Sequence, residues 1–303
     1  MSETTKRIIS GFSIAIVVVI ALYFHEAFGS LHVFLIICLF SLLGVEEFYR
    51  LTDRGIDGKP MRGIGFAFTM IFLAIFYLNY LADHQAWGGL ASFLDVFAKI
   101  ENPILPALVL FLIVASSYAM VYRPLDGIAY SITSTIVGPV YAALPLGLVI
   151  LMLGMAEGPF VFLYLAMGTI MTDVGAYFAG RWFGKHNAGL KVSPKKTYEG
   201  YIGGIIFANL MVQGFVYFWI QFFPNTVSGF VPGWFESVVL TFIISIISVF
   251  GDLVESALKR DARIKDSSST IPGHGGVLDL VDALLFTLPI GFYYFSIRVM
   301  IAG

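Results

Sequence analysis

Apolar runs long enough to cross a lipid bilayer recur along almost the whole of this sequence. They begin near Ile8, Leu31, Gly63, Pro103, Ile128, Pro159, Tyr201, Phe235 and Val281. About 20 apolar residues in a helix span the hydrocarbon core of a membrane, and 58% of the 303 residues are hydrophobic while only 13% are charged. The fifth run contains Pro139 and Pro145, which predict a kinked or broken helix. The sequence therefore predicts an all-α polytopic membrane protein with about nine transmembrane helices, forming a single integral membrane domain over residues 1–303.

The basic residues predict the orientation of the chain. With nine spans and a cytoplasmic N-terminus, every Lys and Arg except Lys99 and Arg298 falls on the cytoplasmic side. Cytoplasmic loops carry an excess of Lys and Arg in membrane proteins. We therefore expect a cytoplasmic N-terminus and an outer C-terminus, with the polar segments 181–200 and 259–278 facing the same cytoplasmic compartment.

Five carboxylates are expected at or near membrane depth. They are Asp173, Asp252, Glu255, Asp279 and Asp282. An ionised carboxylate in hydrocarbon needs a cation, water or a metal, so each is a candidate functional residue. Asp279 and Asp282 are three positions apart, where like charges on one helix face repel. Mg²⁺ would relieve that repulsion, and Asp252 could complete its site. The alternative is that these acids, Glu255 first, are helix-end residues paired with nearby Lys and Arg.

Two polar segments carry further candidate groups. Ser193 or Thr197 is expected to cap the seventh span, while Lys195 and Lys196 are expected to bind a phosphate or, alternatively, lipid headgroups. The free amides at the start of the ninth span are also expected to bind a phosphate. His274 is a candidate acid–base residue or a loop residue bonded to its own backbone. The only cysteine, Cys38, lies in an apolar run, which excludes a cysteine-based metal site or disulfide within one chain.

The stretch from Ser256 to Asp282 resembles the signature of the phosphatidate cytidylyltransferase family, also called CDP-diacylglycerol synthases. The matching positions are Ser256, Leu258, Lys259, Arg260, Lys265, Asp266, His274, Gly275, Gly276, Asp279 and Asp282. The motif around Asp173 and the stretch SPKKTYEG also resemble that family, so the resemblance covers the chain from about Gly168 onward. One position departs from the pattern: Leu280 stands where the family has arginine, and leucine can neither neutralise the flanking aspartates nor bind a phosphate.

The resemblance implies transfer of a cytidylyl group from CTP to phosphatidate, which yields CDP-diacylglycerol and pyrophosphate. It implies a bacterial-type inner membrane, with the active site facing the cytoplasm. Residues 158–303 would supply the catalytic helices and cytoplasmic loops, and residues 1–157 would form N-terminal helices without a recognised motif. The implied catalytic residues are Asp252, Asp279, Asp282, Lys259 and Lys265. The implied substrate-binding residues are Lys195, Lys196, Thr197, Glu199, Ser256, Arg260, Asp266, His274 and Asp173. Asp252, Asp279 and Asp282 would hold Mg²⁺, alone or with a second cation.

Two other functions fit a polytopic protein with buried carboxylates. An ion-coupled transporter would carry such residues near the centres of its spans, whereas the polar residues here gather at the predicted cytoplasmic ends. A CTP-dependent lipid kinase would share the membrane setting and the nucleotide but would release CDP. The expected partners are CTP, phosphatidate and membrane lipid, with no nucleic acid. The sequence leaves open whether the chain works alone or as a homodimer.

Overall fold

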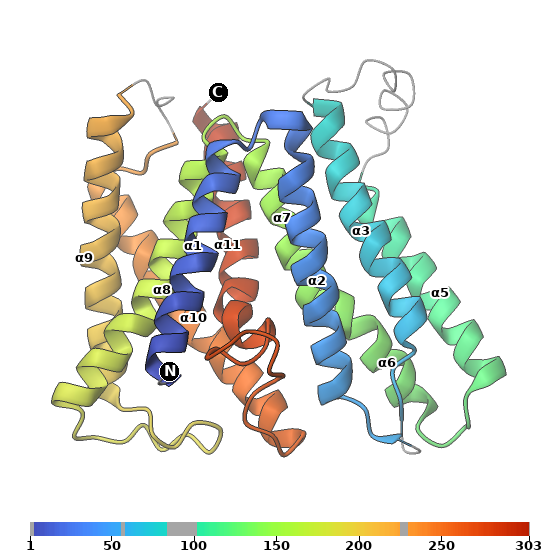
Figure 1. The fold of residues 1–303 in the computed structure, drawn as a ribbon. Helices are drawn as coiled ribbons and strands as arrows, with labels where there is room; N and C mark the ends of the chain where they lie inside the picture. The colour runs from blue at the N-terminus through green and yellow to red at the C-terminus, as the bar shows by residue number, and fades with distance from the viewer. Residues whose placement is uncertain (1–2, 56–57, 84–101, 225–229, 303) are drawn as a thin grey trace. The chain divides into compact units, whose positions relative to one another are not determined.

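The computed structural model describes residues 3–55, 58–83, 102–224 and 230–302, and over these residues it is helical and has no β-strand. Figure 1 shows the described residues as a series of long helices. The α-helices are α1 (Glu3–Tyr23), α2 (Leu31–Leu51), α3 (Arg62–Asp83), α5 (Ile104–Tyr122), α6 (Ile128–Gly138), α7 (Leu144–Leu153), α8 (Gly158–Phe183), α9 (Tyr198–Phe222), α10 (Trp234–Asp261) and α11 (Leu278–Ala302). Two short helices, η1 (Ala27–Ser30) and η4 (Pro139–Ala143), complete the described part.

Within the described residues, eight helical segments are long and apolar enough to cross a membrane. They are Ala27–Leu51, Arg62–Asp83, Ile104–Tyr122, Ile128–Leu153, Gly158–Phe183, Tyr198–Phe222, Trp234–Asp261 and Leu278–Ile301. The first predicted run corresponds to α1, whose apolar stretch Ile9–Tyr23 is shorter. The prediction of an all-α polytopic membrane protein is therefore confirmed, and α1 is the run whose length falls short of the other eight.

The predicted break in the fifth run is confirmed. The helix that starts at Ile128 changes at Pro139 into one turn of π-helix, η4, and resumes as α7 at Leu144. Proline has no amide hydrogen to donate to the preceding turn, so the regular hydrogen-bond pattern stops where Pro139 enters. Pro145 lies in the first turn of α7, where a missing amide hydrogen is tolerated.

The chain forms two compact units, each containing two separate stretches of sequence. The first unit consists of Met1–Gly154 and Asp261–Leu280. The second consists of Met155–Arg260 and Val281–Gly303. Residues 261–280 contain most of the family signature, so the first unit includes that segment together with the N-terminal helices.

The first unit is organised around a buried tyrosine of α2. The hydroxyl of Tyr49, which is fully buried, donates a hydrogen bond to the carbonyl of Thr135 in α6 at 2.7 Å. Gly65 of α3 and Gly138 of α6 lie so close to its ring that a Cβ at either position would overlap it. Two glycines therefore make room for one aromatic ring, which fixes α2 against both α3 and α6.

The second unit is held together by close backbone approaches between its helices. A Cβ at Gly204 of α9 would lie 2.6 Å from the carbonyl oxygen of Thr172 in α8, so these two helices pack backbone to backbone, side by side in Figure 1. A Cβ at Gly251 of α10 would lie 2.8 Å from the carbonyl oxygen of Asp282 in α11. Small residues permit such contacts in membranes, and this one brings Asp252, the next residue, beside the first turns of α11.

Candidate functional site

Lys196 and Asp252 form an ion pair in the second unit. Lys196 precedes the first residue of α9 by two positions, and the Thr197 hydroxyl caps that helix by accepting a hydrogen bond from the Gly200 amide at 3.1 Å. Both charged side chains are largely buried, Lys196 at 29% exposed and Asp252 at 25%. The structure thus confirms Thr197 as the cap, which positions the lysine opposite the aspartate of α10.

Lys196 also interacts with two other carboxylates of the predicted set. Asp173 of α8 and Asp282 of α11 both favour its charged form, whereas burial, the stronger influence, lowers the pKa of Lys196. Three helices thus direct aspartates toward one lysine that precedes a fourth. The structure thus places Asp173, Asp252 and Asp282 near Lys196, whereas the sequence had predicted a shared site for Asp252, Asp279 and Asp282.

A second ion pair lies one turn further along α10. Glu255 is fully buried and pairs with Lys259, which is 14% exposed. The helix-end ion pair considered as the alternative for Glu255 is therefore confirmed. Asp282 interacts electrostatically with both members of the pair. The hydroxyl of Ser256 lies 3.5 Å from Asp252 Oδ1, at the limit of a hydrogen bond.

The loop that carries the basic residues before α9 folds back on itself. The Tyr198 amide donates to the carbonyl of His186 at 3.0 Å, and the Ala188 amide donates to that of Lys196 at 2.8 Å. At the base of the loop, Glu199 Oε1 lies 2.5 Å from His186 Nδ1 and also accepts from the His186 amide at 3.2 Å. Glu199 therefore holds the loop closed, while the neighbouring Lys195 is exposed.

The signature loop is the segment 262–277 between α10 and α11. Asp279, in the first turn of α11, belongs to the first unit and closes this loop. Its Oδ2 accepts hydrogen bonds from the amide and the hydroxyl of Ser267 and from the amide of Gly276, each at 2.8 Å. A Cβ on Gly275 would lie 2.6 Å from the same oxygen. The glycines of the His-Gly-Gly motif thus allow the backbone to reach the aspartate.

Glu47 of α2 is a site residue that the sequence reasoning missed. The amides of Val277 and Leu278, at the start of α11, donate to its two carboxylate oxygens at 3.0 and 2.8 Å. These two amides therefore already donate to a carboxylate of the chain itself, and phosphate binding by the other opening amides of α11 stays a prediction. Glu47 lies in an apolar run, so the criterion that selected Asp173 could also have selected it.

Lys265, Asp266 and His274 lie in the loop of the first unit, whereas Arg260 lies near the end of α10 in the second, with its Nε 3.5 Å from the carbonyl of Val192. His274 Nδ1 lies 2.9 Å from the hydroxyl of Ser10 in α1, and the His274 amide donates to the carbonyl of Ile271 at 3.1 Å. Lys265 and Asp266 are exposed. The histidine ring thus connects the signature segment to α1, whereas the loop alternative expected a bond to its own backbone; a role in catalysis stays a prediction.

The carboxylates of the second unit suit a hard divalent cation. Over the residues that the structure describes, no three His, Cys, Asp or Glu side chains gather closely enough to form a metal site by themselves. Mg²⁺ is usually held by one or two carboxylates together with substrate phosphates and water, so it does not require such a cage. Asp252 and Asp282 supply hard oxygen donors from helices that touch at Gly251. Their chemistry fits Mg²⁺ shared with a phosphate-bearing substrate.

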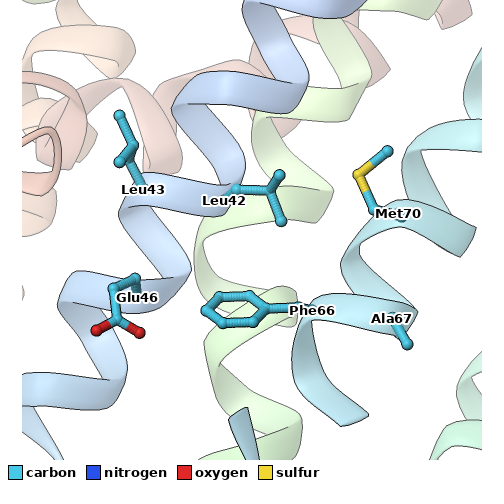
Figure 2. Close-up of a pocket in the computed structure, with 6 residues that line it drawn as sticks. All are labelled: Leu42, Leu43, Glu46, Phe66, Ala67 and Met70. Carbon is cyan, nitrogen blue, oxygen red and sulfur yellow. The ribbon is translucent and has the colours of Figure 1, made fainter. Parts of the chain in front are cut away.

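An apolar groove lies between α2 and α3 of the first unit (Figure 2). It has a volume of about 560 Å³ and is lined by Leu42, Leu43, Glu46, Phe66, Ala67 and Met70. Glu46 pairs with Arg50 at 2.9 Å and with Arg62 at 2.8 Å, so its charge is compensated within the unit. The lining is therefore apolar apart from Glu46, an acid that would repel a phosphate rather than bind it.

Comparison with known proteins places these residues in a wider context. A model of the cytidylyltransferase family matches residues 5–298. The phosphatidate cytidylyltransferase of Haemophilus influenzae is 44% identical over 141 residues, which are 46% of this chain and 46% of the relative. That of Staphylococcus haemolyticus is 42% identical over 135 residues, 45% of this chain and 48% of the relative. That of Bacillus subtilis is 41% identical over 124 residues, which are 41% of this chain and 42% of the relative. The chain thus spans about half the length of the curated relatives it matches.

Proposed function

Because this chain belongs to the cytidylyltransferase family, we propose that it transfers a cytidylyl group from CTP to phosphatidate and releases pyrophosphate. The observation that carries the proposal is the family match over residues 5–298. It is supported by relatives that bear the name phosphatidate cytidylyltransferase, and by the cluster of carboxylates around Lys196 in the second unit. The product would be CDP-diacylglycerol, made within the membrane in which the protein is embedded.

The proposed reaction requires that the two substrate phosphates be positioned and their negative charge stabilised, and it does not require a strong base. An oxygen of the phosphatidate phosphate would form the new bond to the α-phosphorus of CTP, and the bond from that phosphorus to the β-phosphate oxygen would break. The attacking phosphate is already an anion, so no proton has to be removed first. Cationic groups held in fixed geometry lower the barrier of such a transfer, and Lys196, Lys259 and Arg260 are the cations we assign to the phosphates.

We assign Mg²⁺ to Asp252 and Asp282 of the second unit, together with phosphate oxygens of CTP. Bound there, the ion would neutralise negative charge on the transferring phosphorus and the departing pyrophosphate. The Lys196 ammonium, which pairs with Asp252 in the structure, would then turn to the substrate phosphate. Asp279 we assign to the support of the signature loop, because its Oδ2 already accepts three hydrogen bonds.

The family signature suggests further substrate contacts and a location. We propose such contacts for Asp173, Lys195, Thr197, Glu199, Ser256, Lys265, Asp266 and His274. The concentration of basic residues in segments 181–200 and 259–278 supports an active site on the cytoplasmic face of a bacterial inner membrane, where CTP is available.

The decisive experiment follows both products of the reaction. Purified protein is incubated with CTP, phosphatidate and Mg²⁺, and the lipid and the released nucleotide or phosphate are identified. We expect CDP-diacylglycerol and pyrophosphate in equal amounts. Release of CDP with a phosphorylated lipid would indicate a kinase, and transport without a chemical product would indicate a transporter; either result would overturn the proposal.

A further inference from the structure

Glu47 is a buried carboxylate near the C-terminal end of an apolar helix. It lies in α2 and is only 2% exposed. A carboxylate buried in this way is strongly disfavoured unless hydrogen-bond donors or cations surround it. The neighbouring Glu46 instead lies at the surface groove and pairs with two arginines, so adjacent glutamates of one helix have different environments.

All the donors that the described residues direct at Glu47 come from one short segment, residues 267–278. The Oε1 oxygen accepts from the Ser268 hydroxyl at 2.6 Å and from the Val277 amide at 3.0 Å. The Oε2 oxygen accepts from the Ser267 hydroxyl at 2.9 Å and from the Leu278 amide at 2.8 Å. Each oxygen therefore has two donors, and the four contacts hold both ends of that segment.

This arrangement requires a carboxylate. An ionised carboxylate is an acceptor at both oxygens, whereas an amide has one acceptor oxygen and one donor nitrogen. A glutamine at position 47 would therefore direct N–H groups at two existing donors, whichever way it turned. The backbone makes room for Glu47 at Gly276, where a Cβ would overlap both Glu47 Oε2 and the Ser267 hydroxyl.

Glu47 is linked through one hydroxyl to the first aspartate of the signature. The Ser267 oxygen lies 2.9 Å from Glu47 Oε2 and 2.8 Å from Asp279 Oδ2. A serine hydroxyl carries one proton, so the two carboxylates share it. The position of Asp279, and of the first turn of α11 that carries it, therefore depends on Glu47.

We propose that Glu47 is a positioning residue for the reaction: it fixes the signature loop and the start of α11, so that the aspartates of that helix are correctly placed for the substrate phosphates. This inference rests on the proposed function, although the order that Glu47 imposes on the loop can be measured without any activity. It also assigns a role to α2, in the half of the chain that carries no recognised motif.

The test compares Glu47→Gln with Glu46→Gln, the matched change at the adjacent position. Hydrogen–deuterium exchange is measured on peptides covering residues 267–278, and kcat and KM are measured for CTP and phosphatidate. We expect faster exchange in this loop and a kcat lower by about 10–100-fold for Glu47→Gln, with little change in KM. Glu46→Gln is expected to resemble the wild type in all three measurements. Glu47→Asp keeps both acceptor oxygens and is expected to recover part of the loss.

The possible outcomes separate this inference from the proposed function. Unchanged exchange or unchanged kcat in Glu47→Gln would overturn the positioning role. Faster exchange in the α8 and α9 peptides as well would indicate general loosening and would also overturn it. If the wild type makes no CDP-diacylglycerol, the proposed function fails while the exchange comparison still tests the loop. Should Glu47→Gln not fold, Ser268→Ala removes one donor to Oε1, and unchanged exchange there would count against the proposal.

Discussion

Asp279 and Asp282 are one helical turn apart on α11, yet their carboxylates have different partners. Asp279 accepts three hydrogen bonds from Ser267 and Gly276 of the signature loop. Asp282 interacts with Glu255, Asp173 and Lys259 in the second unit. The first aspartate is therefore stabilised by neutral donors, whereas the second lies among other charges. We expect the two to respond differently to substitution.

If the proposed reaction holds, Asp282→Asn should change the Mg²⁺ dependence of CDP-diacylglycerol formation more than Asp279→Asn does. An amide is a much weaker Mg²⁺ ligand than a carboxylate, so we expect Asp282→Asn to need more Mg²⁺ for half-maximal activity. Asp279→Asn should lower kcat at saturating Mg²⁺ because the loop loses acceptor strength at Oδ2. A Mg²⁺ titration of CDP-diacylglycerol formation checks both, and identical titration curves for Asp282→Asn and the wild type would refute the metal assignment.

Replacing Lys196 tests the cation at the centre of the second unit. Lys196→Ala leaves Asp252 without its ion pair and removes a charge assigned to the substrate phosphate. We expect kcat/KM to fall by about 100-fold or more, the scale on which loss of one stabilising donor acts in a transition state. Lys196→Arg keeps the charge and should retain most of the activity. Equal losses in both variants would show that the geometry of the ammonium, rather than its charge, matters.

The pH dependence of activity should also report on Lys196. Burial lowers the pKa of this lysine, so it loses its proton at a lower pH than an exposed lysine. If the charged form is needed, activity falls as the pH rises through that lowered pKa. Arginine remains protonated throughout this range, so Lys196→Arg should move the alkaline decline to higher pH. The substrates ionise identically in both assays. If activity declines at the same alkaline pH in the wild type and in Lys196→Arg, Lys196 is not the titrating group.

Hydropathy and proline positions were enough to predict most of the fold. The spans follow from apolar length, and the interruption at Pro139 follows from its missing amide hydrogen. The sequence placed Lys196 and Asp252 at predicted cytoplasmic ends, but it did not predict the ion pair between them. Nothing in the sequence alone fixes which lysine approaches which aspartate, because Lys196 and Asp252 are 56 positions apart in the chain.

The signature loop shows where prediction from sequence reached its limit. Glu47 and Leu278 are 231 positions apart, and no local pattern links a glutamate in an apolar helix to the start of a distant one. The sequence therefore suggested that the opening amides of α11 were available to a phosphate. In the folded chain α2 lies beside the start of α11, so the Glu47 carboxylate accepts from the amides of Val277 and Leu278.

The glycines of the signature loop offer a test of packing. A Cβ on Gly276 would overlap the Ser267 hydroxyl and Glu47 Oε2, so Gly276→Ala should lower the stability by about 1–3 kcal/mol and reduce activity. Gly214 of α9 is exposed with open space around it, so Gly214→Ala should be neutral or stabilising by about 0.5–1 kcal/mol. Thermal unfolding in detergent measures both, and equal melting temperatures would contradict the packing account.

Leu280→Arg tests the one position that departs from the family signature. Leu280 lies in the first turn of α11 between Asp279 and Asp282 and is partly buried. An arginine there could extend its apolar stem over the protein and direct its planar guanidinium at a carboxylate or phosphate through two hydrogen bonds. We therefore expect Leu280→Arg to raise kcat/KM for CTP. Leu280→Lys should raise it less, because the lysine ammonium has the charge but cannot make the paired hydrogen bonds of a planar guanidinium. Because both variants add one positive charge, a difference between them isolates the geometry of the contact. Equal gains would assign the effect to charge alone, and no gain in either would show that leucine is fully compatible with the proposed reaction.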